Sequence, residues 1–140
     1  MEMIPISKYK LPLEVVYYTT KSGKEKKFRL NLNNYNAAHR RVRGLAKKAY
    51  ADLIQPLVAA DAGLALNNVH ITYTLYVKNK RLSDLDNWIS IVQKFFLDVL
   101  VKNNIIIDDN FKYYKSFSCK FGGVTKNKSE YIEAVLYKAN

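Results

Sequence analysis

The chain has 140 residues, a length that fits a single domain with one hydrophobic core, and 49% of them are hydrophobic and 25% charged, as in an ordinary globular protein. No apolar run approaches the roughly 20 residues that span a bilayer, and the start of the chain lacks the features of a signal peptide. The single cysteine, Cys119, excludes an internal disulfide framework and a cysteine-rich zinc site. We therefore expect one domain over residues 1–140, in a reducing, cytoplasmic compartment.

The net charge is the first indication of function. The sequence holds 23 lysines and arginines against 12 acidic residues, a formal charge of +11. Such an excess favours polyanionic partners, because phosphates release condensed counterions when basic side chains neutralise them. The charge predicts a class of partner, nucleic acid, but it indicates no reaction, and a basic protein with another role would share it.

Residues near the N-terminus predict two strands joined by a tight turn. Residues 13–20 and 27–32 are rich in β-branched and aromatic side chains, and residues 21–24 between them contain Gly23. This pattern predicts a β-hairpin.

A helix is expected next, with Asn33 or Asn34 as its N-cap. Pro56 predicts a kink or an early stop, and Gly63 a clearer end. Helical spacing predicts an apolar stripe made of Ala38, Val42, Leu45, Ala49 and Leu53. The basic side chains of this segment lie largely on other faces: Arg40, Arg41, Arg43, Lys47 and Lys48.

The second half of the chain predicts a strand, a helix and two further strands. Residues 68–77 alternate apolar and polar, which places Val69, Ile71, Tyr73, Leu75 and Val77 on one face. A helix is expected from near Asp86, with a stripe of Trp88, Val92, Phe95 and Val99 that Ile89, Phe96 and Leu100 widen. Residues 111–121 and 131–137 predict the last strands. The order β-β-α-β-α-β-β indicates an α+β fold, a mixed sheet with two main helices packed on it.

Two acidic clusters stand out in this basic chain. Asp84 and Asp86 lie in the sequence DLDN where a strand gives way to a helix, and Asp108 and Asp109 precede a strand. Neighbouring carboxylates repel each other, increasingly so as water is excluded, and a divalent cation removes that cost. Mg²⁺ favours oxygen ligands and often binds through a few carboxylates and a substrate phosphate. The clusters therefore predict a metal site.

Each cluster also has an ordinary structural explanation. Asp84 or Asp86 can serve as a helix N-cap, and Asp108 with Asp109 can form a turn. Neither explanation accounts for both pairs lying at the ends of elements, where a sheet-and-helix fold could bring them together. The surrounding positive charge favours the metal hypothesis.

Metal-dependent phosphodiester cleavage is the chemistry that such a site predicts. Carboxylate-held metal activates an attacking water and stabilises the more negative transition state. A nearby cation can stabilise the phosphate or protonate the leaving oxygen, and Lys80, Arg81 and Lys94 are the candidates. For Lys80 and Arg81, the alternative is a role in solubility alone.

Other chemistries find little support. The sequence has no GxxxxGK[ST] phosphate loop and no GxGxxG turn. His39 and His70 lack metal-ligand spacing, and Cys119 lies in a strand pattern that predicts burial rather than nucleophilic chemistry. Trp88 fits the helix stripe, which favours core packing over base stacking.

The motifs of the central segment resemble those of the RusA-type Holliday-junction resolvases. The relevant residues are 81–87 (RLSDLDN), 94–100 (KFFLDVL) and 107–109 (IDD), which are similar to that family's DxDN, KxxxDxL and DD. Upstream, residues 33–35 (NNY) and the basic helix after them resemble its N-terminal region. The specific motifs cover about residues 81–109, and the flanks agree mainly in element order.

The resemblance implies a single RusA-like domain that forms a homodimer, binds branched DNA and resolves four-way junctions in recombination and repair. It implies Mg²⁺ or Mn²⁺ as the cofactor, no small-molecule cofactor and no membrane, in a bacterium or its phage or prophage. Asp84, Asp86 and Asp109 would be the catalytic, metal-binding carboxylates, and Lys94 a catalytic or DNA-contacting lysine. DNA would further be bound by Lys80, Arg81, Arg40, Arg41, Arg43, Lys47 and Lys48.

This sequence departs from the family pattern in two places. Four extra residues between Asn87 and Lys94 add about one helical turn, so Lys94 is expected a turn further from the metal. Ser83 stands where a basic residue is expected, and Arg81 or Lys80 would substitute for it. The rival hypotheses are a non-catalytic DNA-binding module and an endonuclease that acts on other branched DNA or flaps.

Overall fold

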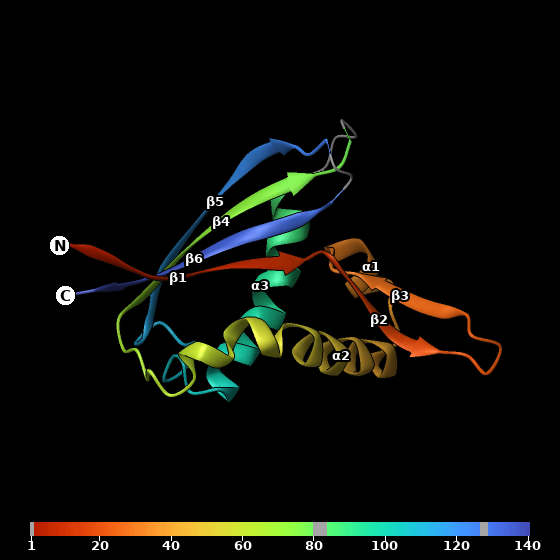
Figure 1. Ribbon diagram of the computed structural model, residues 1–140, viewed down its shortest axis with the longest axis horizontal. Helices are drawn as coiled ribbons and strands as arrows, with labels where there is room; N and C mark the ends of the chain where they lie inside the picture. The colour runs from red at the N-terminus through yellow and green to blue at the C-terminus, as the bar shows by residue number, and fades with distance from the viewer. Residues whose placement is uncertain (1, 80–83, 127–128) are drawn as a thin grey trace.

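A computed structural model describes residues 2–79, 84–126 and 129–140 of the chain (Figure 1). Its elements, in chain order, are β1 (Met3–Pro12), β2 (Glu14–Thr19), β3 (Glu25–Arg29), α1 (Leu32–Ala37), α2 (Arg40–Val58), a 3-10 turn (Ala59–Asp61), β4 (Val69–Val77), α3 (Leu85–Lys102), β5 (Tyr114–Val124) and β6 (Tyr131–Ala139). The α+β class and the predicted element order are confirmed.

A four-stranded mixed sheet forms the centre of the fold. Its strand order is β1-β6-β4-β5, with β4 and β5 parallel and the other two pairs antiparallel. Helix α3 connects β4 to β5, because two parallel strands need a long crossover and cannot be joined by a tight turn. Helices α2 and α3 lie to one side of this sheet, and β2 with β3 forms a separate hairpin that projects past the helices (Figure 1).

Strand β1 and the short helix α1 are additions to the predicted elements. The sequence of β1, MIPISKYKLP, contains two prolines, and proline argues against a central strand. The prolines are tolerated because β1 lies at an edge of the sheet, and Pro5 adjoins an irregularity in its pairing with β6.

The strands bury one face against the helices. In β4, Val69, Ile71, Tyr73 and Leu75 are buried, which confirms the predicted alternation. Neighbouring strands contribute the same face, with Ile132, Ala134 and Leu136 from β6 and Tyr9 and Leu11 from β1. The predicted stripe of α3 is also confirmed, because Trp88, Val92, Phe95, Val99 and the residues that widen it are all buried.

The predicted stripe of the first long helix is confirmed in part, because Ala38, Val42 and Ala49 pack half-buried against the core. The buried side chains of α2 are Ala46, Tyr50, Ile54 and Val58, whereas Leu45 and Leu53 are 37% and 48% exposed. Apolar residues occur around more than one face of this helix, so the packing against β2 and α3, rather than periodicity, selects the buried face.

The predicted helix start is also corrected. Asn33 and Asn34 lie inside α1, and the Asn31 side chain caps that helix by accepting a 2.8 Å hydrogen bond from the Asn34 backbone N–H. A second helix then begins at Arg40, capped by His39. Pro56 lies in the last turn of α2, which ends at Val58.

Phe95 of α3 lies at the centre of an aromatic cluster. Its ring stands 6.4 Å from that of Phe28 on β3, 6.2 Å from Tyr35 on α1 and 5.8 Å from Tyr50 on α2, measured between centroids. The buried Tyr50 hydroxyl donates a 2.8 Å hydrogen bond to the Pro12 carbonyl at the end of β1. One side chain therefore holds the hairpin and three helices together.

Strand β5 is exposed along almost its whole length. Phe117 and Phe121 are 51% and 55% exposed, and Cys119 between them is exposed, so the prediction that Cys119 is buried is wrong. Apolar and polar residues alternate regularly in the sequence of β5. The strand is nevertheless exposed, because it lies at the edge of the sheet and the helices scarcely cover it. In the part of the chain that the structure describes, no helix has the length and apolar character needed to cross a bilayer.

Phe95→Ala is expected to lower the free energy of unfolding by about 3–5 kcal/mol, because it leaves a cavity between four elements. Urea denaturation followed by circular dichroism measures the change. Phe111→Ala is the matched control: Phe111 is 90% exposed, so the cost should be about 0.5 kcal/mol or less. Equal losses in both variants would show that the cluster is not the centre of the core.

Candidate metal site and nucleic-acid surface

Asp84 and Asp86 lie at the exposed start of α3. Asp84 occupies the N-cap position, but its side chain makes no capping hydrogen bond. Asp86 lies in the first turn and accepts a 2.8 Å hydrogen bond from the Ser90 hydroxyl. Both residues are exposed. Capping therefore does not explain the Asp84 carboxylate, and both side chains present oxygen atoms to solvent.

Asn87 and Trp88 hold the start of α3 in place. The Asn87 side-chain oxygen accepts a 3.1 Å hydrogen bond from the Leu32 backbone N–H at the start of α1. The ring of Trp88 is 8% exposed and faces the Arg29 guanidinium, 4.9 Å from the ring centroid. The assignment of Trp88 to packing rather than base stacking agrees with this burial.

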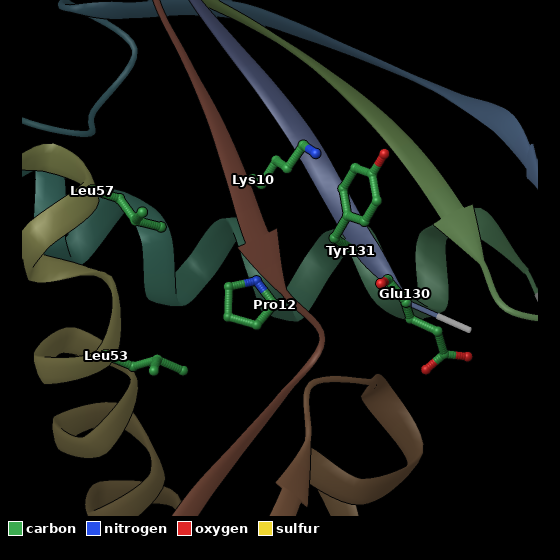
Figure 2. A pocket seen from close by; sticks show the side chains of 7 residues that line it. Lys10, Pro12, Leu53, Leu57, Glu130 and Tyr131 are labelled. Carbon is green, nitrogen blue, oxygen red and sulfur yellow. The ribbon is translucent and has the colours of Figure 1, made fainter. Parts of the chain in front are cut away.

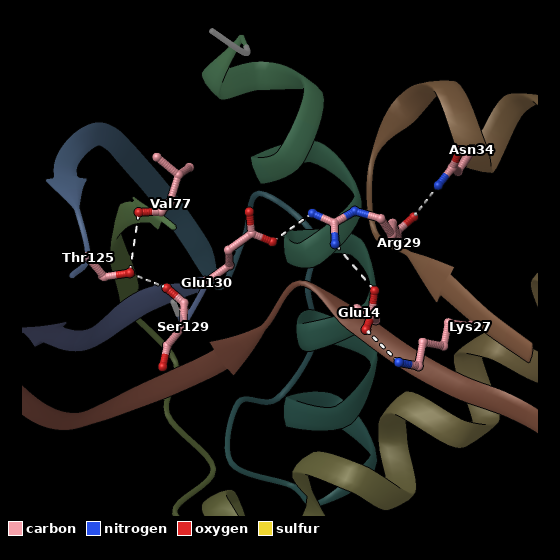
Figure 3. Close-up of polar contacts among 8 residues, drawn as sticks. All are labelled: Glu14, Lys27, Arg29, Asn34, Val77, Thr125, Ser129 and Glu130. Carbon is pink, nitrogen blue, oxygen red and sulfur yellow. Dashed lines mark hydrogen bonds and ion pairs between the residues drawn. The ribbon is translucent and has the colours of Figure 1, made fainter. Parts of the chain in front are cut away.

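Arg29 is itself held by two carboxylates. Its guanidinium donates to Glu130 at 2.7 Å and to Glu14 at 3.3 Å, as Figure 3 shows. Glu14 also pairs with Lys27 at 3.8 Å. The acidic end of α3 is thus fastened to β2, β3 and the start of β6. Sequence analysis missed Arg29, since Glu130 is 101 residues away and no local pattern links the two.

The second acidic pair forms a turn before β5. The Asp108 carboxylate accepts 2.8 Å hydrogen bonds from the Asp109 backbone N–H and the Asn110 side-chain amide. The turn explanation therefore applies to Asp108. Asp109 is exposed, and its pKa is raised, first by partial burial of the carboxyl and then by the neighbouring carboxyls of Asp108 and Asp98.

The two acidic clusters lie at opposite ends of the fold. Asp84 and Asp86 follow the end of β4, whereas Asp109 precedes the start of β5, which pairs with the start of β4. The intervening helix α3 has 18 residues and is about 27 Å long. Among the residues that the structure describes, no group of three His, Cys, Asp or Glu side chains could hold a metal. One chain therefore does not bring Asp84, Asp86 and Asp109 together.

Lys94 lies apart from the acidic end of α3. It follows Asp86 by eight residues, which is about 12 Å along the helix axis. Its ammonium lies 5.9 Å from the centroid of the Tyr35 ring. Ser90, one helical turn from Asp86, lies closer to the Asp86 carboxylate than Lys94 does. The other two candidate cations, Lys80 and Arg81, lie outside the described residues.

The basic residues of α2 fall into two groups. Arg43 donates to the backbone carbonyls of Tyr35 and Asn36 at 2.7 and 3.2 Å, and Lys47 pairs with Asp98 at 3.0 Å. These two side chains have contacts within the fold. The second group consists of exposed α2 cations that form no ion pair among the described residues, namely Arg40, Arg41 and Lys48.

Two hollows lie on the surface near α2 and the hairpin. A hollow of about 440 Å³ lies between α2 and the ends of β1 and β6, and it is lined by apolar Leu53, Leu57 and Pro12 beside Lys10 and Tyr131 (Figure 2). A smaller one of about 270 Å³ lies at the base of the hairpin. Neither of these two hollows is lined by the predicted aspartates.

Comparison with known proteins assigns no family. The chain matches none of the models of known protein families, and a search of curated proteins finds no relative. The candidate site therefore depends on its own residues and their geometry.

Asp109→Asn is expected to raise the free energy of unfolding at pH 7. The raised pKa means that the folded chain holds the charged carboxylate less favourably than the unfolded chain does. The gain should fade as the pH falls through the raised pKa and be absent below the ordinary value of 3.8. Urea denaturation at pH 7 and pH 3 measures it. The exposed Asp52→Asn is the control, and a loss of stability at pH 7 in Asp109→Asn would contradict the expectation.

Proposed function

We propose that this protein is a metal-dependent endonuclease that cuts four-way DNA junctions as a homodimer. The observation that carries the proposal is the pair of exposed carboxylates at the start of α3, of which Asp84 takes no part in capping, in a chain of charge +11. The resemblance of residues 81–109 to the RusA motifs supports the same reaction. Mg²⁺ or Mn²⁺ is the proposed cofactor.

The donor set suits a hard divalent cation. Asp84 and Asp86 would supply carboxylate oxygens, the ligands that Mg²⁺ prefers, with substrate phosphate completing the coordination. A bound cation would make an attacking water more acidic and stabilise the negative charge that develops on the phosphate. The protein itself orients Asp86 through Ser90 and directs the positive end of the α3 dipole at the phosphate.

Two copies would complete a site that one copy leaves divided. A two-fold axis that sets two α3 helices antiparallel would place Asp84 and Asp86 of one subunit near Asp109 of the other. The position of the two clusters beyond opposite ends of α3 supports this arrangement. The exposed apolar side chains of β5, Phe117 and Phe121, offer surface for such a contact.

A symmetric dimer suits a substrate that needs paired incisions. Two equivalent sites would cut two strands of a four-way junction in a symmetric manner. Arg40, Arg41 and Lys48 would contact backbone phosphates without reading sequence. DNA recombination and repair are the processes in which such a reaction is needed.

A non-catalytic DNA-binding module is the second candidate. It is favoured by the division of the acidic clusters within one chain and by the turn that occupies Asp108. Cleavage of a synthetic four-way junction and a matched linear duplex, with Mg²⁺ and with chelator, separates the two functions. Nicks in other branched substrates or flaps, but not in the junction, would redefine the substrate.

Asp86→Asn is expected to reduce metal-dependent junction cleavage by at least about 100-fold while sparing junction binding, because the substitution removes a ligand charge and leaves the surface cations unchanged. Single-turnover cleavage and gel-shift assays measure the two properties. Asp52→Asn, which removes an exposed acid of α2, should cut normally. Normal cleavage by Asp86→Asn would contradict the site.

Mixing two inactive variants tests the shared site. Asp86→Asn and Asp109→Asn should each be inactive alone. If each site combines Asp86 of one subunit with Asp109 of the other, a mixed dimer has one intact site, and single-strand nicking returns after subunit exchange. Active homodimers of both variants would contradict the role of these residues. Two inactive variants that fail to complement, despite exchange shown by mass spectrometry, would contradict the shared site alone.

A further inference from the structure

The outer half of the β2–β3 hairpin projects away from the rest of the protein. Val15 and Phe28, near its base, are buried against the core, whereas Tyr18 is 52% exposed. Residues 21–27 are all exposed. Figure 1 shows this part of the hairpin extending beyond the end of α2. We call residues 18–26 the basic arm.

The tip of the basic arm is an ordered turn. Thr20 and Lys24 are joined by a 2.8 Å backbone hydrogen bond, and the Gly23 N–H donates to the Thr20 carbonyl at 2.9 Å. The Thr20 hydroxyl contacts the Ser22 hydroxyl and accepts from the Lys24 N–H, both at 3.0 Å. Gly23 has φ +87°, a conformation that favours glycine. The lysines on either side of this turn therefore start from a defined backbone.

The basic arm carries three lysines and one acid, Glu25. Lys21, Lys24 and Lys26 are exposed and form no ion pair within the described chain. Lys27 and Arg29, closer to the base of the hairpin, are paired with Glu14. Internal pairing thus neutralises the base of the hairpin, and positive charge remains at its outer end.

We propose that the basic arm is a DNA-binding element that grips backbone phosphates of a duplex outside the cut site. Lysine ammonium groups together with Thr19 and Ser22 hydroxyls are phosphate donors, and such contacts position DNA without reading its sequence. Tyr18 pairs with Lys26 across the two strands and adds an aromatic side chain to this surface. The inference rests on the proposed function only in taking DNA as the polyanion.

The base of the hairpin connects the basic arm to the candidate metal site. Arg29, the last residue of β3, lies over Trp88, two residues after Asp86. Strand β3 runs from Arg29 out to Glu25 next to the turn, a length of about 14 Å. A duplex held by the arm is therefore held at a set distance from the acidic end of α3, on the side where α2 packs against β2.

The test combines Lys21→Gln, Lys24→Gln and Lys26→Gln in one variant. Fluorescence anisotropy with a labelled duplex and a labelled four-way junction, in chelator, measures binding across a salt series. Three lost phosphate contacts should lower the slope of log affinity against log salt by about 2.7 and weaken binding roughly 10- to 100-fold at low salt. Each single substitution should lower the slope by about 0.9.

The control variant removes the same charge elsewhere. Lys10→Gln, Lys102→Gln and Lys138→Gln, combined, alter three exposed lysines on β1, α3 and β6 that form no ion pair within the described residues. Equal effects of the two triple variants would overturn the proposal, because net charge alone would then explain binding. Loss of binding only in the arm variant supports it even if no cleavage is found, whereas cleavage with arm-independent binding supports the nuclease and overturns the arm.

Discussion

The β4–α3–β5 crossover is the constraint on which the candidate site depends. Parallel neighbours need a connection that returns the chain to the starting end of the sheet, and α3 makes this return as one straight helix. Residues before the helix and residues after it therefore lie at opposite ends of the sheet. This geometry divides Asp84 and Asp86 from Asp109, and it is why the proposed metal chemistry calls for a second copy.

Packing around α3 links that constraint to the hairpin and its basic arm. Phe95 gathers α1, α2 and β3 about the middle of the helix, while Trp88 and Arg29 fasten its acidic end to the hairpin. Arg29 is shared between Glu14 and Glu130, so β2 and β6 are tied to the same point. The start of α3, with Asp84 and Asp86, and the base of the basic arm are thus attached to the same packed core.

The acids of the fold stand in different electrostatic surroundings. Many acids of the fold face cations: Glu14 and Glu130 face Arg29, and Asp98 faces Lys47. Asp109 is different, because burial and neighbouring carboxyls raise its pKa. Cations of the basic arm and of α2 are among those with no ion pair within the described residues.

Sequence alone determined the element order, the buried face of β4 and the stripe of α3, because local periodicity reports these directly. It also determined which acids stand at element ends. Only the tertiary structure decided which face of α2 is buried, that β1 joins the sheet, that Cys119 is exposed and that Arg29 supports α3. Those outcomes depend on contacts between residues distant in the chain, such as Arg29 with Glu130, and on which edge of the sheet the helices leave uncovered. The spacing of residues along the sequence indicates neither these long-range contacts nor the uncovered edge of the sheet.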